Sequence, residues 1–249
     1  MKVTVITAAY NSASTIRDTL DSVLGQDYSD LEYVVIDGAS KDETLTIIKS
    51  YSNRISTIIS EPDRGIYDAI NKGIRAATGD IIAILHADDV FAHAHVLSHV
   101  VQKMESGNVD AVYGDLLYVQ RDNLEKVVRH WKSGTYRHGL FLKGWMPPHP
   151  SFFLKRGCYE QYGLYTDKLV SAADYELMLR MLHKHRVSVA YLPEVLVRMR
   201  VGGVSNRSFK NRIRANREDR EAWRMNGLHP GLLTLIRKPL SKLKQFIFK

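Results

Sequence analysis

Residues 79–89 have the sequence GDIIAILHADD, and this stretch decides the fold. Residues 81–85 form a short, uninterrupted apolar run, which is typical of a strand buried on both faces of a sheet. The run leads directly into two adjacent carboxylates, Asp88 and Asp89. Ligands of open parallel sheets bind at the carboxyl ends of the strands, so this acid pair stands where such a sheet would hold a ligand.

Three similar strand patterns precede this one, at residues 3–6, 33–36 and 55–59. An apolar pattern of helical spacing follows each of them, and the helix before the fourth strand is predicted over residues 67–77. The alternation of strands and helices predicts an α/β fold with a mostly parallel, doubly wound, Rossmann-like sheet.

Polar clusters follow all four predicted strands, at residues 7–11, 37–42, 61–65 and 86–89. The carboxyl ends of parallel strands share one edge of a sheet, so the four clusters predict a single site. The chain has neither GxGxxG nor GxxxxGK[ST], which argues against a dinucleotide cofactor bound in the Rossmann manner and against a P-loop NTPase.

The acid pair could hold Mn²⁺ or Mg²⁺, hard cations that would neutralise a diphosphate leaving group. The alternative is that Asp88 and Asp89 are solvated turn residues or helix caps. Asp37, at the end of an apolar run, could accept hydrogen bonds from a nucleobase or a ribose, or could cap the turn at Gly38. Arg64 could meet a phosphate, or could form a surface ion pair.

The charge of the chain is unevenly distributed. The 249 residues carry a net charge of +8, but residues 206–249 hold twelve Lys/Arg and three Asp/Glu, whereas residues 1–205 hold 23 and 24. A near-neutral body argues against a nucleic-acid-binding domain. The single cysteine excludes a disulfide framework, and no apolar stretch reaches the roughly 18 residues that a membrane-spanning helix needs.

Six segments match a known family in order and spacing, over roughly residues 1–200. They are VTVITAAYN, EYVVIDGASKDET, SEPDRGIYDAINKGIRAATGDIIAILHADD, VYGD, PHPSFF and SAADYELMLRM. With these segments the chain resembles the family 2 inverting glycosyltransferases, which have the GT-A fold. The EPDRGIYDAINKG segment is similar to a bacterial subgroup of polysaccharide clusters that includes colanic-acid-type transferases.

The resemblance implies a role for each matching residue. The side chains expected to bind the nucleotide and donor sugar are Thr7, Ala9, Tyr10, Asn11, Asp37, Arg64, Asp68, Lys72 and Asp88. Asp89 would hold the metal, with Asp88 beside it. The sequence departs from the family at His86, where many relatives have Asp or Asn.

Asp174 matches the family's general base. An inverting transfer needs one carboxylate to take the proton of the acceptor hydroxyl. Asp174 stands at the start of the amphipathic segment SAADYELMLRML, where it could instead be only a helix N-cap, and Glu176 is a second candidate base. The resemblance also makes His149 a candidate contact of acceptor or diphosphate, as Trp145 could be, and the alternative for His149 is a structural residue. Arg198 and Arg200 are further diphosphate candidates and could equally be surface charges.

Two further patterns have simpler explanations beside the functional ones. His93, His95 and His99 include the i, i+4 spacing of a zinc pair, but HExxH is absent and we expect no zinc site. Residues 230–249 combine apolar residues at helical spacing with basic residues and no acid, which favours an anchor on an anionic membrane surface. The alternative for this tail is a helix that packs on the catalytic domain.

The sequence therefore predicts a GT-A catalytic domain over residues 1–205 and a basic helical tail over residues 206–249. Residues 1–115 would bind the nucleotide-sugar donor, and residues 116–205 the acceptor. The expected reaction is a metal-dependent, inverting transfer to a hydroxyl of a saccharide or polyprenyl-linked acceptor in surface polysaccharide biosynthesis. The expected location is cytoplasmic, on the inner face of the plasma membrane.

Two other classes of protein were weighed against this one. A nucleotidyltransferase acting on sugar phosphates uses a similar sheet and metal, but would normally show a glycine-rich loop after the first strand, which TAAYNS lacks. A nucleic-acid-binding protein would rely on the basic tail alone, so no nucleic-acid partner is expected.

Overall fold

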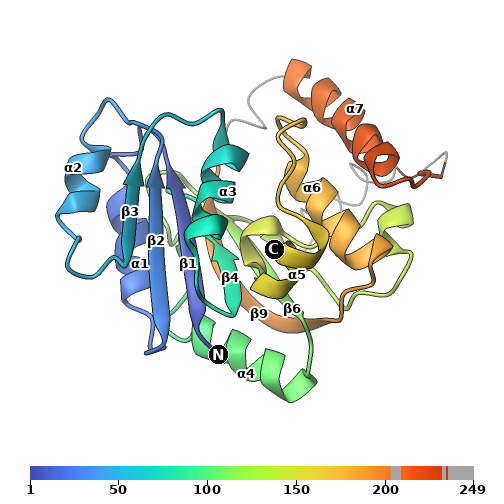
Figure 1. Cartoon of the computed structure of the whole chain (residues 1–249), viewed down its shortest axis with the longest axis horizontal. Coiled ribbons are helices and arrows are strands. Elements are labelled where there is room, and N and C mark those ends of the chain that lie inside the picture. Colours follow the sequence, from blue (N-terminus) through green and yellow to red (C-terminus); the bar gives the residue numbers. More distant parts are fainter. Residues whose placement is uncertain (203–208, 232–233, 235–249) are drawn as a thin grey trace.

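The computed structural model of the chain describes residues 1–202, 209–231 and 234 (Figure 1). Its first half alternates strand and helix as predicted. The elements are β1 Val3–Ala9, α1 Ile16–Leu24, β2 Leu31–Asp37, α2 Thr44–Lys49, β3 Thr57–Ser60, α3 Ile66–Ala76 and β4 Ile81–Ile84. β1 pairs in parallel with β2 and with β4, and β2 pairs in parallel with β3. The direction of winding reverses between β1 and β4, which is where such sheets bind ligands.

Two predicted strand boundaries were wrong. β1 keeps its pairing with β2 as far as Ala9, opposite Asp37, so Thr7 and Ala9 lie inside the strand instead of following it. β3 pairs with β2 only from Thr57, opposite Val34, and it therefore starts later than predicted.

The second half completes one mixed sheet. Its elements are β5 Asp89–Phe91, α4 Val96–Gly107, β6 Ala111–Val119, β7 Val127–Trp131, β8 Phe152–Lys155, α5 Arg156–Tyr162, α6 Ala173–Met178, β9 Val189–Arg200 and α7 Phe209–Met225. Short 3₁₀ segments lie at Leu140–Lys143 and His149–Ser151, and a π-helical segment, Leu179–Lys184, continues α6. The strand order is β3-β2-β1-β4-β8-β6-β9-β5, with β7 paired to β6. β8 runs antiparallel to both β4 and β6, and it joins the two halves.

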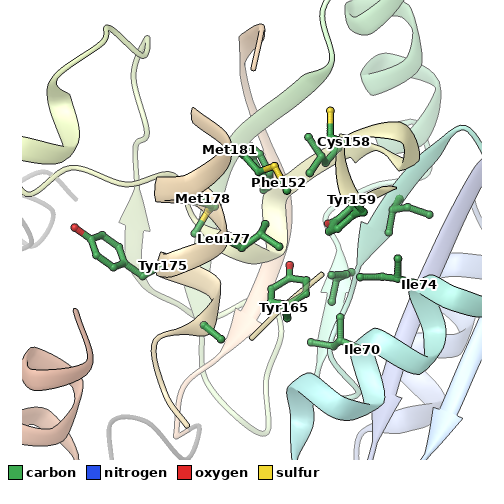
Figure 2. Close-up of a cluster of buried hydrophobic side chains, with 14 of the residues drawn as sticks. Ile70, Ile74, Phe152, Cys158, Tyr159, Tyr165, Tyr175, Leu177, Met178 and Met181 are labelled. Atoms are coloured by element: carbon green, nitrogen blue, oxygen red, sulfur yellow. The ribbon is translucent and has the colours of Figure 1, made fainter. Parts of the chain in front are cut away.

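Hydrophobic side chains fill both faces of the sheet. On one face α3, α5 and α6 cover a cluster in which Ile70 and Ile74 of α3 point toward Tyr159 and Tyr165 (Figure 2). On the other face, α1 and α4 cover a second cluster. Helix α3 lies very close to β1, because a Cβ at Gly73 would stand 2.3 Å from Cγ2 of Ile6. The α/β class with a parallel first half is confirmed.

Helix α7, from the predicted tail, packs on α6 (Figure 1). The indole Nε1 of Trp223 donates to the hydroxyl of Tyr175 at 2.9 Å, and Nδ2 of Asn226 donates to Glu176 at 3.0 Å. Thr234 is buried and donates to the carbonyl of Leu142. The rest of the predicted anchor, apart from residues 230 and 231, lies outside the described residues. Within those residues, no helix has the length and apolar character to cross a membrane.

Candidate active site

Asp37 ties together the loops that follow β2 and β3. Its carboxylate is completely buried and accepts hydrogen bonds from Oγ of Ser60 at 2.7 Å and from the backbone N–H of Ser40 at 3.3 Å. The N–H of Gly38 donates to the carbonyl of Ala9. The ends of β1, β2 and β3 therefore form one compact edge.

Tyr10 directly follows β1 at this edge, and 59% of its surface is exposed. The next residue, Asn11, adopts a left-handed conformation (φ 48°), and its Oδ1 accepts from the N–H of Lys41 at 2.9 Å. This bond fixes the loop after β1 to the loop after β2, with an aromatic ring exposed beside it. Thr7, in contrast, is buried in β1, where its hydroxyl bonds to that of Tyr33 at 3.0 Å.

A charged cluster stands at the start of α3. Lys72 contacts Asp63 at 2.6 Å, Glu61 at 2.8 Å and Asp68 at 3.7 Å. Hydrogen bonds to Asp63 and Glu61 raise the pKa of Lys72, so it carries its charge. Arg64 pairs with Asp68 at 3.1 Å while 76% of its side chain stays exposed.

This cluster adjoins the edge formed by the ends of β1, β2 and β3. Oδ2 of Asp63 would lie 2.9 Å from a Cβ at Gly38, which places the loop after β3 directly against the loop after β2. The hydrogen bonds from the backbone and side chain of Arg64 lower the pKa of Asp68. Cations and anions here are paired, and Arg64 is the most exposed of them.

The charge and hydrogen-bonding capacity of the acid pair, Asp88 and Asp89, are only partly satisfied by the surrounding residues. Asp89 is 1% exposed; its Oδ1 accepts from the N–H of Arg200 at 3.2 Å, and its Oδ2 is buried without a hydrogen-bond partner. Burial, and then the charge of Asp88, raise the pKa of Asp89 well above its usual value. A buried carboxylate oxygen without a partner beside a second carboxylate fits a divalent cation, which would restore the ionised form.

Arg200, and not Arg198, is the arginine of β9 that contacts the acid pair. Arg200 donates to the carbonyl of Asp88 at 2.8 Å and forms an ion pair with Asp18. Arg198 instead bonds to the carbonyl of Leu124 and pairs with Glu125.

Asp174 lies in the first turn of α6. The N-cap position of this helix is Ala172, so Asp174 is not the N-cap. Its Oδ1 accepts from the N–H of Tyr175 at 2.7 Å and from the hydroxyl of Tyr67 at 3.4 Å. No other hydrogen bond or ion pair of this carboxylate is found in the described part of the chain, which leaves Oδ2 open.

The second candidate base, Glu176, has a structural role. It is 3% exposed, and its two oxygens bond to Arg180 at 2.9 and 3.0 Å, while Asn226 donates to it as well. A carboxylate that is buried and paired in this way is not available to an acceptor hydroxyl.

His86 connects the two acidic parts of the site. Burial lowers its pKa, and the charges of Asp88 and Asp174 oppose this shift, so both carboxylates act on the imidazole electrostatically. His149 stacks on His86 with ring centroids 5.6 Å apart, and its Nε2 is hydrogen-bonded to the hydroxyl of Tyr165 at 2.8 Å. Burial lowers the pKa of His149 to about 3, so this imidazole is neutral. His149 thus packs its ring against that of His86 while it is held by Tyr165.

Trp145 lies in an aromatic cluster away from these acids. Its Nε1 donates to the carbonyl of Ser133 at 2.8 Å, and its ring stacks on Tyr136 at 5.1 Å.

The three clustered histidines are paired with acids: His93 and His99 with Glu194, and His95 with Asp27. No group of three or more potential ligands in the described residues is arranged to hold a metal ion.

Sequence reasoning missed two contributors to the site. Ser60 lies at the carboxyl end of β3 and could have been found by the rule that selected the other strand ends. Tyr67 gave no such signal, because its contact with Asp174 spans 107 residues.

The fold and the site define an α/β enzyme of the GT-A type, with its ligand edge at the carboxyl ends of the parallel strands. Residues 4–163 match the family model described as "Glycosyl transferase family 2". The chain belongs to this family and is a glycosyltransferase.

Relatives and solved structures agree with this assignment. The chain is 29% identical over 207 residues to the PGL/p-HBAD biosynthesis glycosyltransferase of Mycobacterium tuberculosis, which covers 81% of this chain and 78% of the relative. It is 32% identical to an uncharacterized glycosyltransferase of the same organism over 72% of this chain and 68% of the relative.

The fold matches S. aureus TarS 1-349 in complex with UDP, with a TM-score of 0.66 and 18% identity, over 89% of this chain and 65% of that one. It also matches the mannosyltransferase PcManGT of Pyrobaculum calidifontis in complex with GDP-Man and Mn²⁺. The TM-score is 0.66 and the identity 23%, over 97% of this chain and 73% of the PcManGT chain. The chain thus spans slightly less than two thirds of the TarS chain.

Proposed function

We propose that this glycosyltransferase inverts the anomeric centre as it moves a sugar from a nucleoside-diphosphate sugar to an acceptor hydroxyl. The observation that carries the proposal is that the site holds two acidic parts of different kinds. Asp88 and Asp89 form a pair in which Oδ2 of Asp89 is buried without a partner, whereas Asp174 is paired with no cation within the described residues. This arrangement supports separate roles for leaving-group stabilisation and for proton abstraction.

The donor would bind along the edge formed by the loops after β1, β2 and β3. The exposed ring of Tyr10 offers a stacking surface for a base. Asp37 is fully buried and bonded to Ser40 and Ser60, so it would shape the edge that receives the base or ribose. The exposed Arg64, with Asp68 and Lys72 behind it, offers charge and hydrogen bonds to the diphosphate or sugar. Solved relatives in complex with UDP, UDP-GlcNAc and GDP-Man support a nucleotide-sugar donor.

Asp88 and Asp89 would hold Mn²⁺ or Mg²⁺ in this proposal. The unpartnered Oδ2 of Asp89 supports it, as does the Mn²⁺ in the complex of PcManGT. The ion, when bound, would neutralise charge on the departing diphosphate.

Asp174 would act as the general base. The acceptor oxygen attacks the anomeric carbon, the bond from that carbon to the diphosphate oxygen breaks, and the hydroxyl proton passes to Asp174. Oδ2 is the oxygen suited to receive the proton, because Oδ1 already accepts two hydrogen bonds. Attack from the side opposite the leaving group inverts the configuration.

The test compares Asp174→Asn and Asp89→Asn with the parent. Asp174→Asn should reduce turnover by about 10²- to 10⁴-fold, the range of general acid–base catalysis. Asp89→Asn should reduce turnover through the loss of a metal ligand, and both variants, compared without added metal, should melt close to the parent. Product NMR should show the anomer opposite to the donor's. An Asp174→Asn protein with full activity would contradict the base, a retained anomer would contradict the mechanism, and release of pyrophosphate would favour a nucleotidyltransferase.

We also propose that the acceptor is a saccharide carried on a polyprenyl lipid for surface polysaccharide, and that residues 230–249 bring the enzyme to the inner membrane face. Support comes from the sequence, since this segment is basic, amphipathic and free of acids. The full chain should bind vesicles containing phosphatidylglycerol but not pure phosphatidylcholine. A Lys242→Glu/Lys244→Glu variant should lose that binding, and unchanged binding would refute the anchor.

A further inference from the structure

Tyr67 contacts the proposed base from another part of the chain. It is the second residue of α3, and its hydroxyl donates to Oδ1 of Asp174. Burial, and then the charge of Asp174, raise the pKa of Tyr67 well above its usual value. The hydroxyl therefore keeps its proton and acts toward the carboxylate only as a donor.

The orientation of the Tyr67 ring is fixed by its stack on Tyr165, which is itself held in place. It stacks on Tyr165 with centroids 5.7 Å apart and planes 13° from parallel. Tyr165 is itself held at both backbone groups by the buried Asn71, whose Nδ2 donates to its carbonyl at 2.8 Å and whose Oδ1 accepts from its N–H at 3.0 Å. Because Asn71 follows Tyr67 by one helical turn, one face of α3 supplies both contacts.

The neighbouring face of the same helix carries the charges proposed for the donor. Asp68 and Lys72 directly follow Tyr67 and Asn71, and they pair with Arg64 and Asp63. Helix α3 packs closely against β1 at Gly73. A single helix therefore sets the position of the donor-side charges and of the group that meets Asp174.

We infer that Tyr67 is a positioning residue that holds the Asp174 carboxylate aimed at the acceptor hydroxyl, an inference that rests on the proposed role of Asp174. Tyr67 does not exchange its own proton with the substrate. Its hydroxyl occupies Oδ1, so that Oδ2 is presented to the acceptor.

The first experiment uses Tyr67→Phe, which keeps the ring and its stack on Tyr165. We expect kcat to fall about 3- to 30-fold, less than the 10²- to 10⁴-fold of a group that itself transfers the proton, with the KM for the donor unchanged within about twofold. Tyr51→Phe is the matched control. Tyr51 follows α2, its hydroxyl accepts a hydrogen bond from Arg17 at 3.3 Å, and its replacement should leave both quantities unchanged.

The second experiment is the double variant Tyr67→Phe/Asp174→Asn. If Tyr67 acts through Asp174, the double variant should be no slower than Asp174→Asn alone, because the two residues act as a unit. Multiplied losses, or a Tyr67→Phe protein with the parental kcat, would overturn the inference and leave the base intact. Full activity of Asp174→Asn would instead overturn the proposed function, so the two failures are distinct.

Discussion

The backbone N–H of Arg200 donates to Oδ1 of Asp89 at 3.2 Å, while the guanidinium of Arg200 donates to the carbonyl of Asp88 at 2.8 Å. One residue of β9 therefore fixes both acids of the pair. The guanidinium forms its ion pair with Asp18, and its charge lowers the pKa of Asp89 by less than burial and the charge of Asp88 raise it. The negative charge of the pair is therefore only partly neutralised, which leaves it suited to a further cation.

This arrangement predicts how Asp89 links stability to pH and metal. Because the pKa of Asp89 is raised in the folded protein, this group stabilises the fold at low pH, and that contribution is lost as the pH rises through the raised pKa. Metal-free Asp89→Asn should therefore be at least as stable as the metal-free parent at neutral pH. Mn²⁺ at a hundred times its Kd should raise the free energy of unfolding of the parent by about 2.7 kcal/mol and leave that of Asp89→Asn unchanged. Thermal melting with and without Mn²⁺ measures this, and equal stabilisation of both proteins would contradict it.

Glu32 should show the opposite pH dependence. Although burial raises its pKa, hydrogen bonds from Thr4 and Thr78, with Lys2 beside them, outweigh burial and lower it to about 2. Its stabilising effect is complete above the ordinary value of 4.5 and is lost as the pH falls toward 2. Glu32→Gln should unfold in urea with about 2 kcal/mol less free energy at pH 7, and the difference should shrink in acid. The exposed Glu160→Gln should change stability by less than about 0.5 kcal/mol at any pH.

Gly73 and Gly157 should respond oppositely to an added methyl group. At Gly73 the new Cβ would overlap Ile6, so Gly73→Ala should destabilise the protein by about 1–3 kcal/mol or more. Nothing lies within 4 Å of a Cβ at Gly157, in α5, so Gly157→Ala should stabilise it by up to about 1 kcal/mol. Urea unfolding measures both, and a neutral Gly73→Ala would show that α3 can move away from β1.

Trp223 should account for much of the attachment of α7. It is 1% exposed, and its indole donates to Tyr175 on α6. Trp223→Ala should reduce the free energy of unfolding by about 3–5 kcal/mol, and Trp223→Phe, which removes the hydrogen bond and part of the volume, by less. Arg217→Ala, at an exposed position of α7, is the control and should have little effect. Wild-type stability of Trp223→Ala would mean that α7 contributes nothing to the folded body.

The sequence allowed the parallel half and its ligand edge to be predicted, because both follow from local patterns. The apolar runs before Asp37 and Asp89 mark buried strands, and the strand-end rule then brings their acids to one edge. The placement of the antiparallel β8 between β4 and β6 could not be predicted, since its partners are far away in the sequence.

Within the site, the pattern could not separate residues of the same type. Asp174 and Glu176 are two positions apart, yet only Glu176 meets Arg180 and Asn226. Arg198 and Arg200 share one strand, yet only Arg200 contacts the acid pair. Each distinction depends on a partner brought by another element, which no local spacing records.

The insertion of β8 has a consequence for how the protein is made. Until residues 152–155 have left the ribosome, one edge of β4 and one edge of β6 have no neighbour, so a nascent chain of about 110 residues exposes an open strand edge. The part that would bind the donor therefore cannot complete its sheet ahead of the part that would bind the acceptor. Isolated fragments cut between β4 and β8 should therefore aggregate.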